Sequence, residues 1–359
     1  MKQPDTVRKA LTMLIAPLAL TALPAGAQSL EVTNFNGYND FFVGTDENNN
    51  QLVFYSPSDG ECSVVGFITE NTSLTIPQTI TKISEKEVYD DENGWYWVPD
   101  TIVQDVREVR ITTDYEWNVN VFENAPNLKD VVVNNNVAMI RYDYPYSDRA
   151  VNLHFTTDTA PGFDIRGKYL DYGMESRRVI FAPEASVDSY SDALLGQAAW
   201  VLAEGTDPDA AFAEEVAAIG ALQIIRNDES GIRYAEWIGE VNGTTFGFSG
   251  DDNMSFRGVR TSESSVSVPT SVYISFPEEY AYRVMPVVYM HLDYQEIEEF
   301  CFPDCDNLQD IYLPETIASA EWWGANFTNK YKFHFCTPEV PSLYFYNGCD
   351  SYDINIVVP

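Results

Sequence analysis

Two stretches of this chain, 180 residues apart, carry nearly the same order of apolar and polar residues. Asn127–Val137 reads NLKDVVVNNNV, and Asn307–Ile317 reads NLQDIYLPETI. When residues 122–161 are laid over residues 302–341 without gaps, nine of 40 positions are identical and several more exchange one apolar residue for another. A 359-residue chain that repeats itself in this way indicates an internal duplication, so we expect its fold to be assembled from repeated units.

A shorter period runs inside each copy. Apolar residues with one residue between them recur every 22 to 26 positions. In the first copy these pairs are Val109-x-Ile111, Val131-x-Val133, Leu153-x-Phe155 and Val179-x-Phe181. In the second copy they are Val266-x-Val268, Val288-x-Met290, Ile311-x-Leu313, Phe333-x-Phe335 and Ile356-x-Val358. Because alternate residues of a strand point to the same side, each pair predicts a short strand with one inward face, and stacked strands would share a continuous core.

This period predicts the class of fold. A period of about 20 to 29 residues with the pattern L-x-x-I-x-L is typical of leucine-rich repeats. Two segments fit that pattern directly: Leu128-x-x-Val131-x-Val133 and Leu308-x-x-Ile311-x-Leu313. We therefore expect a β-rich α/β solenoid of degenerate leucine-rich repeats of about 22–23 residues, in two tandem arrays with short helices at the cap and at the joint.

The residue between two inward residues is expected to face outward. Its side chain is free to vary, so a row of such positions can form a binding surface. The candidates at these positions are Arg110, His154, Tyr312 and His334. His154 and His334 also occupy the same place in the two copies, which favours a structural or surface role for both over a catalytic one.

Several segments resemble a known repeat family. FENAPNLKDVVV and FCFPDCDNLQDIYLPETI are similar to the AF-x-x-C-x-x-L-x-x-I-x-I-P unit of BspA-type leucine-rich repeats. The segments from Leu52 to Ile80 and from Tyr89 to Ile102 resemble the opening hairpins of that family, the second with Asn93-Gly94 as a type I′ turn. Val179–Trp200 resembles its closing strand and helix.

The resemblance covers about residues 40–200 and 232–359. Ala125 stands where the family often has Cys, and Asn134 replaces the usual Pro. Proteins of this family are exported or surface proteins of Bacteroides-like bacteria. The resemblance therefore implies a protein that contacts host proteins, other cells or surface glycans.

The first 27 residues have the three parts of a secretory signal peptide. Lys2, Arg8 and Lys9 form a basic start, Leu11–Ala22 an apolar centre, and Ala25-Gly26-Ala27 a small-residue cleavage site. The apolar run is too short and too often interrupted by Pro to span a bilayer, and no longer one follows. We expect an exported chain, secreted, periplasmic or at the cell surface, without a transmembrane segment.

The rest of the chain divides into three predicted parts. Residues 28–203 would form the first array with its N-terminal hairpins and capping helix, residues 204–230 a helical joint, and residues 231–359 the second array. In the joint, Asp207 can cap a helix that starts at Pro208. The residues that then fall on one face are Phe212, Val216 and Ile219, with Gly231 beyond the end.

The charge of the chain limits its partners. With 55 acidic and 21 basic residues the formal net charge is −34, which repels nucleic acid and anionic lipid. The excess favours solubility outside the cell, with cationic partners or bridging calcium as the alternative. The segment from Asp46 imitates the start of a calcium loop, but Gln51 stands where Gly is needed and Pro57 where Glu is needed. We therefore expect no cofactor, and calcium only as an adventitious ion.

Five cysteines follow the predicted cleavage site: Cys62, Cys301, Cys305, Cys336 and Cys349. Export permits disulfides, and an odd number leaves at least one thiol over. The spacings do not select a pairing. No His lies near the Cys301 and Cys305 pair at zinc-site spacing, so no metal site is predicted.

Motifs for catalysis are missing from the sequence. GxSxG, P-loop, GxGxxG and HExxH patterns do not occur, and acidic pairs are too frequent at this composition to identify a hydrolytic pair. Three aromatic clusters, NGWYWVPD, YDYPYSD and EWWGANF, are expected in loops or turns, where rings stack on sugars or anchor proteins, or else fill the convex side of the repeats. Their candidate residues are Trp95, Trp97, Tyr142, Tyr144, Trp322 and Trp323.

The sequence thus favours a non-enzymatic exported binding or adhesion protein that presents its repeats to protein or glycan partners. Two alternatives stay open. The chain can be a carbohydrate-active protein or another hydrolase accessory that uses its acidic surface, or a structural spacer of the cell envelope.

Overall fold

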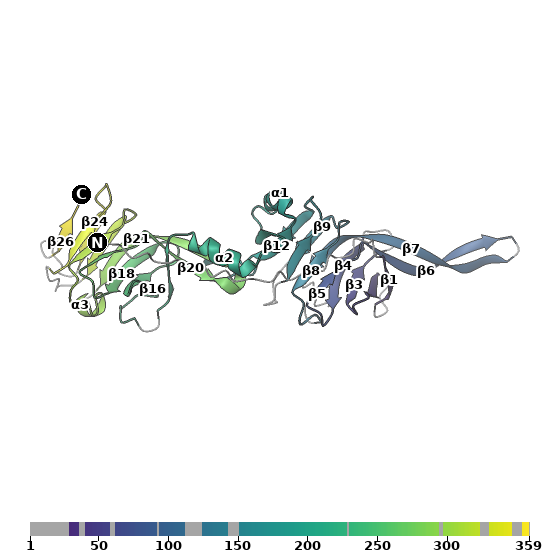
Figure 1. Ribbon diagram of the computed structural model, residues 1–359, viewed down its shortest axis with the longest axis horizontal. Coiled ribbons are helices and arrows are strands. Elements are labelled where there is room, and N and C mark those ends of the chain that lie inside the picture. Colours follow the sequence, from purple (N-terminus) through teal and green to yellow (C-terminus); the bar gives the residue numbers. More distant parts are fainter. Residues whose placement is uncertain are drawn as a thin grey trace, which may run out of the picture. The chain divides into compact units, whose positions relative to one another are not determined.

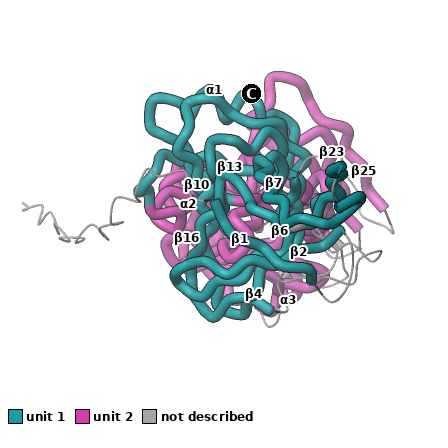
Figure 2. Tube along the Cα trace, turned by 90° about the vertical axis from the view of Figure 1, so that its right-hand side faces the viewer, with its two compact units in different colours: residues 1–165, 179–206 teal, residues 166–178, 207–359 magenta. Residues whose placement is uncertain are grey.

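The computed structural model describes residues 29–35, 40–57, 62–91, 93–111, 124–142, 151–227, 230–293, 297–323, 330–346 and 354–358. The chain forms two compact units, coloured separately in Figure 2: residues 1–165 and 179–206 belong to unit 1, and residues 166–178 and 207–359 to unit 2. Strands account for about 53% of the described residues and helices for about 10%. The predicted signal peptide, residues 1–27, lies outside the described residues.

The first sheet of unit 1 begins with four strands, each antiparallel to the next: β1 (Ser29–Asn34), β2 (Phe41–Thr45), β3 (Gln51–Tyr55) and β4 (Cys62–Ile68). β6 (Thr79–Asp90) and β7 (Gly94–Ile111) then form a long antiparallel hairpin, which Figure 1 shows as an extended two-stranded ribbon. β6 also pairs with β1, and β7 with β4. Six of the described strands therefore close into a ring of hydrogen-bonded neighbours.

Short parallel strands complete unit 1. In the first sheet, β7 pairs in parallel with β9 (Met139–Tyr142), and β9 pairs in parallel with β11 (Gly162–Ile165). The second sheet contains β5 (Ser73–Thr75), β8 (Asp130–Val133), β10 (Asn152–Phe155), β12 (Arg178–Ala182) and β13 (Ala199–Ala203). In its parallel part, four apolar residues stand opposite one another: Leu74, Val131, Leu153 and Ile180. Residues of both sheets share one hydrophobic cluster, so the core of unit 1 lies between them.

Unit 2 repeats this order of strands. Its first sheet comprises β14 (Leu222–Gln223), β15 (Ile225–Arg226), β16 (Trp237–Val241), β17 (Thr244–Ser249), β18 (Met254–Arg260), β20 (Ser271–Phe276) and β21 (Ala281–Asp293), extended by β23 (Ser319–Trp323) and β25 (Ser342–Tyr346). Its order of paired strands runs from β14 to β15, which are consecutive segments of the chain. Its second sheet comprises β19 (Ser265–Ser267), β22 (Asp310–Leu313), β24 (Lys332–Phe335) and β26 (Asn355–Val357). Here the parallel register places Val266, Ile311, Phe333 and Ile356 opposite one another.

The predicted α/β solenoid of leucine-rich repeats is wrong. The described chain is mostly strand, and its strands form barrel-like or closed sheets instead of alternating with helices. The apolar pairs do not form one continuous row, because Val109 pairs with Ile140 in one sheet while Val131 pairs with Leu153 in the other. Each period contributes two strands to two opposed sheets. The second strands of each period have only four or five residues, and periodicity over so short a segment does not distinguish a strand from a helix.

In the described ranges, three short α-helices connect these strands: α1 (Val187–Ala193), α2 (Pro208–Ala217) and α3 (Ile297–Phe300). Asp207 caps α2 as predicted, and its side chain accepts a hydrogen bond from the Asp209 amide at 3.1 Å. The helix ends well before Gly231, however, because the rest of the predicted joint forms β14 and β15 of unit 2.

The hairpin turn also differs from the prediction. Asp90 pairs with Gly94, so three residues separate the strands instead of the two of a type I′ turn. Gly94 has a φ of 73°, the left-handed conformation that follows a three-residue hairpin loop.

Most of the described cysteines lie in the cores. Cys62 is buried in unit 1, Cys301 and Cys305 are buried in unit 2, Cys336 is exposed, and Cys349 lies outside the described residues. Burial raises the pKa of the Cys62 thiol to about 12 and also raises the pKa of Cys305, whose Sγ donates to the Val259 carbonyl at 3.2 Å. These thiols stay protonated at neutral pH, which favours packing over reactivity.

Candidate binding surfaces

One face of the β6–β7 ribbon carries a row of exposed apolar side chains. In an antiparallel pair, directly opposed residues project to the same side. The register places Tyr89 opposite Trp95, Glu87 opposite Trp97, Ile83 opposite Thr101 and Thr81 opposite Val103, all on one face. We call its five large apolar residues the hairpin stripe: Ile83, Tyr89, Trp95, Trp97 and Val103.

The hairpin stripe is open to solvent. The exposed fractions are 64% for Ile83, 54% for Tyr89, 67% for Trp95, 62% for Trp97 and 59% for Val103. The rings of Tyr89 and Trp95 lie 5.2 Å apart across the strands. Single exposed apolar residues are ordinary on a protein surface, but five large apolar side chains on one face of a ribbon, two of them Trp, are typical of interaction sites.

The polar residues of this face are acidic. Glu85 and Glu87 on β6 and Asp105 on β7 share the face of the hairpin stripe and are exposed. Lys86 projects to the opposite face, where it forms an ion pair with Asp100 at 3.0 Å. Within the described part of the ribbon, the stripe face therefore combines apolar rings with carboxylates and carries no Lys or Arg from Ile83 to Asp105.

A second aromatic surface lies on unit 2, on the outer face of β21, β23 and β25. We call it the aromatic ladder: Tyr289, His291, Trp323, Tyr344 and Tyr346. The parallel register places Trp323 beside Tyr346, and their rings stack at 4.2 Å. His291 stacks on Trp323 from the other side at 6.0 Å, and the Trp323 indole nitrogen donates to Glu321 Oε2 at 3.3 Å. Rings next to a carboxylate suit a ligand with apolar faces and hydroxyl groups.

The two histidines of the duplicated segment form the same contact in each unit. His154 Nε2 lies 3.1 Å from Asp130 Oδ1, and His334 Nε2 lies 2.7 Å from Asp310 Oδ1. His154 also stacks on Phe181 at 4.5 Å, and its Nδ1 lies 3.1 Å from Glu204. These contacts tie neighbouring strands together, so both side chains serve the packing of their sheets.

The electrostatics of the first pair follow from its partners. Burial disfavours the charged form of His154, but the hydrogen bonds to Asp130 and Glu204 outweigh it and raise the pKa of His154. Burial also acts against the Asp130 carboxylate, but hydrogen bonds from His154 and Asn152 outweigh that effect and lower the pKa of Asp130. The charged pair is thus stabilised on both sides.

The remaining predicted site residues fall into different environments. Tyr142 and Trp322 are fully buried core residues, so the prediction that they bind a partner from loops is wrong. Trp95, Trp97 and Trp323 lie on strands, not in loops, and remain accessible. Arg110 binds Glu108 at 2.8 Å, and Tyr144 lies outside the described residues. Tyr312 stacks on His334 at 4.4 Å.

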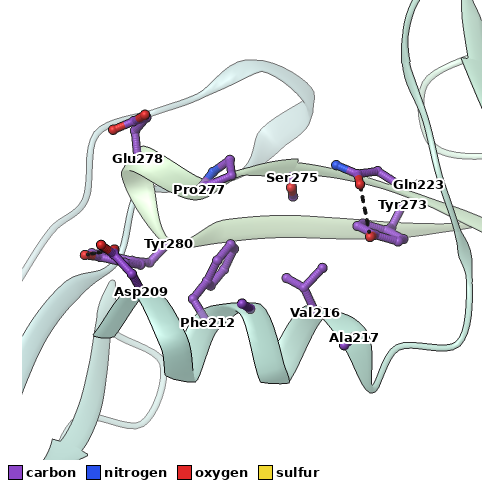
Figure 3. Close-up of a pocket in the computed structure, with 11 residues that line it drawn as sticks. Asp209, Phe212, Val216, Ala217, Gln223, Tyr273, Ser275, Pro277, Glu278 and Tyr280 are labelled. Atoms are coloured by element: carbon purple, nitrogen blue, oxygen red, sulfur yellow. Dashed lines mark hydrogen bonds between the residues drawn. The ribbon is translucent and has the colours of Figure 1, made fainter. Parts of the chain in front are cut away.

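A groove of about 680 Å³ lies in unit 2 between α2 and the β20–β21 hairpin (Figure 3). Phe212 and Val216 project into it from α2, and Tyr273 and Ser275 from β20. The Tyr280 hydroxyl donates to Asp209 Oδ1 at 2.9 Å; burial and this acidic neighbour raise the pKa of Tyr280. The groove shows where α2 covers the hairpin, and sequence periodicity had suggested only that this helix packs on one of the arrays.

The described residues contain neither a metal-binding cluster nor a helix that could cross a membrane. In the described ranges, three or more His, Cys, Asp or Glu side chains do not gather in an arrangement that could hold a metal ion. Among the helices that the structure describes, none has the length and apolar character needed to cross a membrane.

Comparisons with known proteins return one remote likeness. No family model and no curated protein matches the chain. Among solved structures, a leucine rich cell surface protein from Faecalibacterium prausnitzii A2-165 is 9% identical, with 84% of this chain and 78% of that chain covered. The TM-score of 0.23 is too low to establish a shared fold.

Proposed function

We propose that this chain is an exported, non-enzymatic binding or adhesion protein that presents aromatic surfaces to protein or glycan partners. The observation that carries the proposal is the hairpin stripe, with Trp95 and Trp97 more than 60% exposed on one face of a ribbon. Large rigid rings contribute much of the binding energy where they become buried in an interface. The hairpin stripe exposes three such rings, Tyr89, Trp95 and Trp97, together with Ile83 and Val103, and an exposed apolar surface of this kind favours aggregation unless a partner covers it.

The aromatic ladder gives a reason to include glycans among the partners. Trp323, Tyr344 and Tyr346 form an exposed or half-exposed row on β23 and β25, beside Glu321. Sugar rings have apolar faces that stack on aromatic rings and hydroxyl groups that donate to carboxylates. A glycan on unit 2 and a protein on unit 1 are compatible within one adhesion protein.

Binding arrays test the proposal. The labelled mature chain would be applied to immobilised glycans and extracellular surface proteins, together with the variants W95A/W97A and W323A/Y346A. We expect at least one of the two variants to lose about tenfold or more of the binding signal to its ligand class. Tyr169→Ala is the matched control, because Tyr169 is 82% exposed and belongs to neither surface.

Two results would count against the proposal. If both double variants still bind their ligands, the binding does not depend on the hairpin stripe or on the aromatic ladder. Release of new reducing ends from the immobilised glycans by the purified chain would instead favour the hydrolase alternative.

A further inference from the structure

The hairpin that corresponds to β6–β7 is partly covered in unit 2, where Tyr273 is buried while Val284 stays 42% exposed. Strand pairing makes the correspondence, because Ile80 pairs with Leu30 and Gln104, while Val272 pairs with Leu222 and Met285. In this alignment the stripe face of unit 1 matches the face of β20–β21 that carries Tyr273, Ser275, Tyr282 and Val284. α2 lies on that same face, with Phe212 and Val216 in the groove beside Tyr273 and Ser275 (Figure 3).

Helix α2 holds the face by apolar and ionic contacts together. The Phe212 ring is buried, 5.8 Å from the Tyr280 ring and 6.2 Å from the Tyr282 ring. On the same turn of the helix, Glu215 forms an ion pair with Arg177 at 3.1 Å. The acidic helix α2 therefore pairs with a basic residue, Arg177, next to the face of β20–β21 on which it lies.

The equivalent face of unit 1 is longer and more apolar, yet exposed. Ile83 stands where unit 2 has Ser275, and the ribbon adds Tyr89, Trp95 and Trp97 beyond the end of the shorter hairpin. From Ile83 to Tyr89 a strand extends about 20 Å, which is the length of a helix of about 13 residues. The stripe is therefore long enough for three to four turns of a helix laid along it.

Charge indicates which helix would fit. Glu85 and Glu87 lie on the face of the hairpin stripe, and from Ile83 to Asp105 the described part of this face offers no Lys or Arg to match an acidic helix. Asp105 at the base of the ribbon is paired with Arg107 at 3.1 Å. An acidic helix such as α2 would be repelled by the stripe face, whereas Lys or Arg beside an apolar face would pair with the Glu85 and Glu87 carboxylates.

We infer that the hairpin stripe is a docking site for a basic amphipathic α-helix of a protein or peptide partner. The inference rests on the proposed binding function and names the partner class of that surface. Apolar residues at i, i+3, i+4 and i+7 of the partner would pack on Trp95, Trp97 and Ile83, and its basic flank would lie along Glu85 and Glu87.

Three synthetic peptides of 18 residues test this inference. The first places Leu on one helical face and Lys on the other, the second has the same composition in scrambled order, and the third replaces every Lys with Glu. Anisotropy of the labelled peptides against the mature chain at 150 mM NaCl gives the dissociation constants. We expect the first peptide to bind at least about tenfold more tightly than either control peptide.

Variants locate that binding. W95A/W97A should weaken the amphipathic peptide at least about tenfold, to the level of the scrambled one. E85Q/E87Q should weaken it severalfold and flatten its salt dependence. The matched controls are Y169A for loss of an exposed ring and E47Q/E184Q for loss of two exposed carboxylates elsewhere in unit 1; neither should reproduce those losses.

Hydrogen exchange gives a second measurement that does not depend on the variants. Protection by the amphipathic peptide should concentrate in β6 and β7. Equal binding of amphipathic and scrambled peptides, tighter binding of the Glu peptide, or protection spread over the whole acidic chain would each overturn the inference. If array ligands still depend on Trp95 and Trp97 after such a result, the proposed function stands and only the helix-docking inference falls. If the amphipathic peptide binds but no array ligand does, the helix-docking inference stands and the proposed function falls.

Discussion

Units 1 and 2 share one order of strands but present different outer faces. On unit 1, the outward residues of β7, β9 and β11 form an ion network in which Glu108 accepts from Arg110 and Arg141 at 2.8 and 2.7 Å. On unit 2, the corresponding strands carry Tyr289, His291, Trp323, Tyr344 and Tyr346. The inward residues stay apolar in both units because each must fill a core. Outward residues have no such constraint, and there the copies have diverged.

The hairpins show the same divergence on a larger scale. In unit 2 the face of β20–β21 is short and lies under α2, whereas in unit 1 the face of β6–β7 is long and exposed. One copy uses the hairpin face for internal packing and the other offers it to solvent. Seven substitutions, grouped in four experiments, test this contrast.

The largest effect is expected from equivalent core residues. Leu153 and Phe333 occupy matching places in the parallel ladders and are buried. Leu153→Ala should cost about 2–5 kcal/mol and Phe333→Ala about 3–5 kcal/mol of stability. Denaturant titration with peptide-resolved hydrogen exchange should show each loss in its own unit. Equal loss of protection in both units would mean that the two cores are not independent.

Removing the anchor of α2 comes next. Phe212→Ala should cost about 3 kcal/mol, because the buried ring fixes the helix to Tyr280 and Tyr282. Trp97→Ala is the matched change on the uncovered hairpin and should alter stability by less than about 0.5 kcal/mol. Thermal melts check both, and hydrogen exchange in α2 should rise only in the first. A large loss for Trp97→Ala would show that the hairpin stripe is structural.

The ion network of unit 1 should contribute less. Glu108→Gln removes the buried charge that accepts from Arg110, Arg141 and Ser63, and should cost about 1–3 kcal/mol. Tyr289→Ala, at the corresponding place in unit 2, removes an exposed ring and should cost less than about 0.5 kcal/mol. Denaturant midpoints compare the two variants, and equal costs would remove the contrast between these faces.

The smallest effect should depend on pH. The folded state raises the pKa of His154, so the charged ring stabilises the fold fully below its unfolded value of about 6.5. That contribution disappears as the pH rises through the raised pKa. His154→Ala should therefore cost roughly 1 kcal/mol at pH 5.5 and less at pH 8.5, measured as melting temperatures in both buffers. A gap that widens with pH would contradict this sign.

The sequence predicted some local features because their causes are local. Asp207 and Pro208 carry a helix start by themselves, and α2 begins there. The pattern around Leu153 and Phe333 required short strands with one inward face, and both lie in parallel ladders. The sequence identifies Trp95, Trp97 and Trp323 as candidates by residue type alone, and only the structure shows that their side chains are accessible.

Other features depended on partners far along the chain. Tyr142 and Trp322 look like surface aromatics in sequence but are core residues, because their strands turn those positions inward against the opposing sheet. The acidic face of the β6–β7 ribbon likewise emerges only from the cross-strand register, which puts Glu87 beside Trp97.

The sequence by itself determined that this chain is duplicated and that each copy contains short strands with a regular apolar period, because a strand records its inward face in every second residue. Only the tertiary structure decided how those strands meet. Whether a second apolar segment becomes a helix or a strand of an opposing sheet, and whether a hairpin face is covered or exposed, depends on contacts between residues far apart in the chain, which periodicity does not encode.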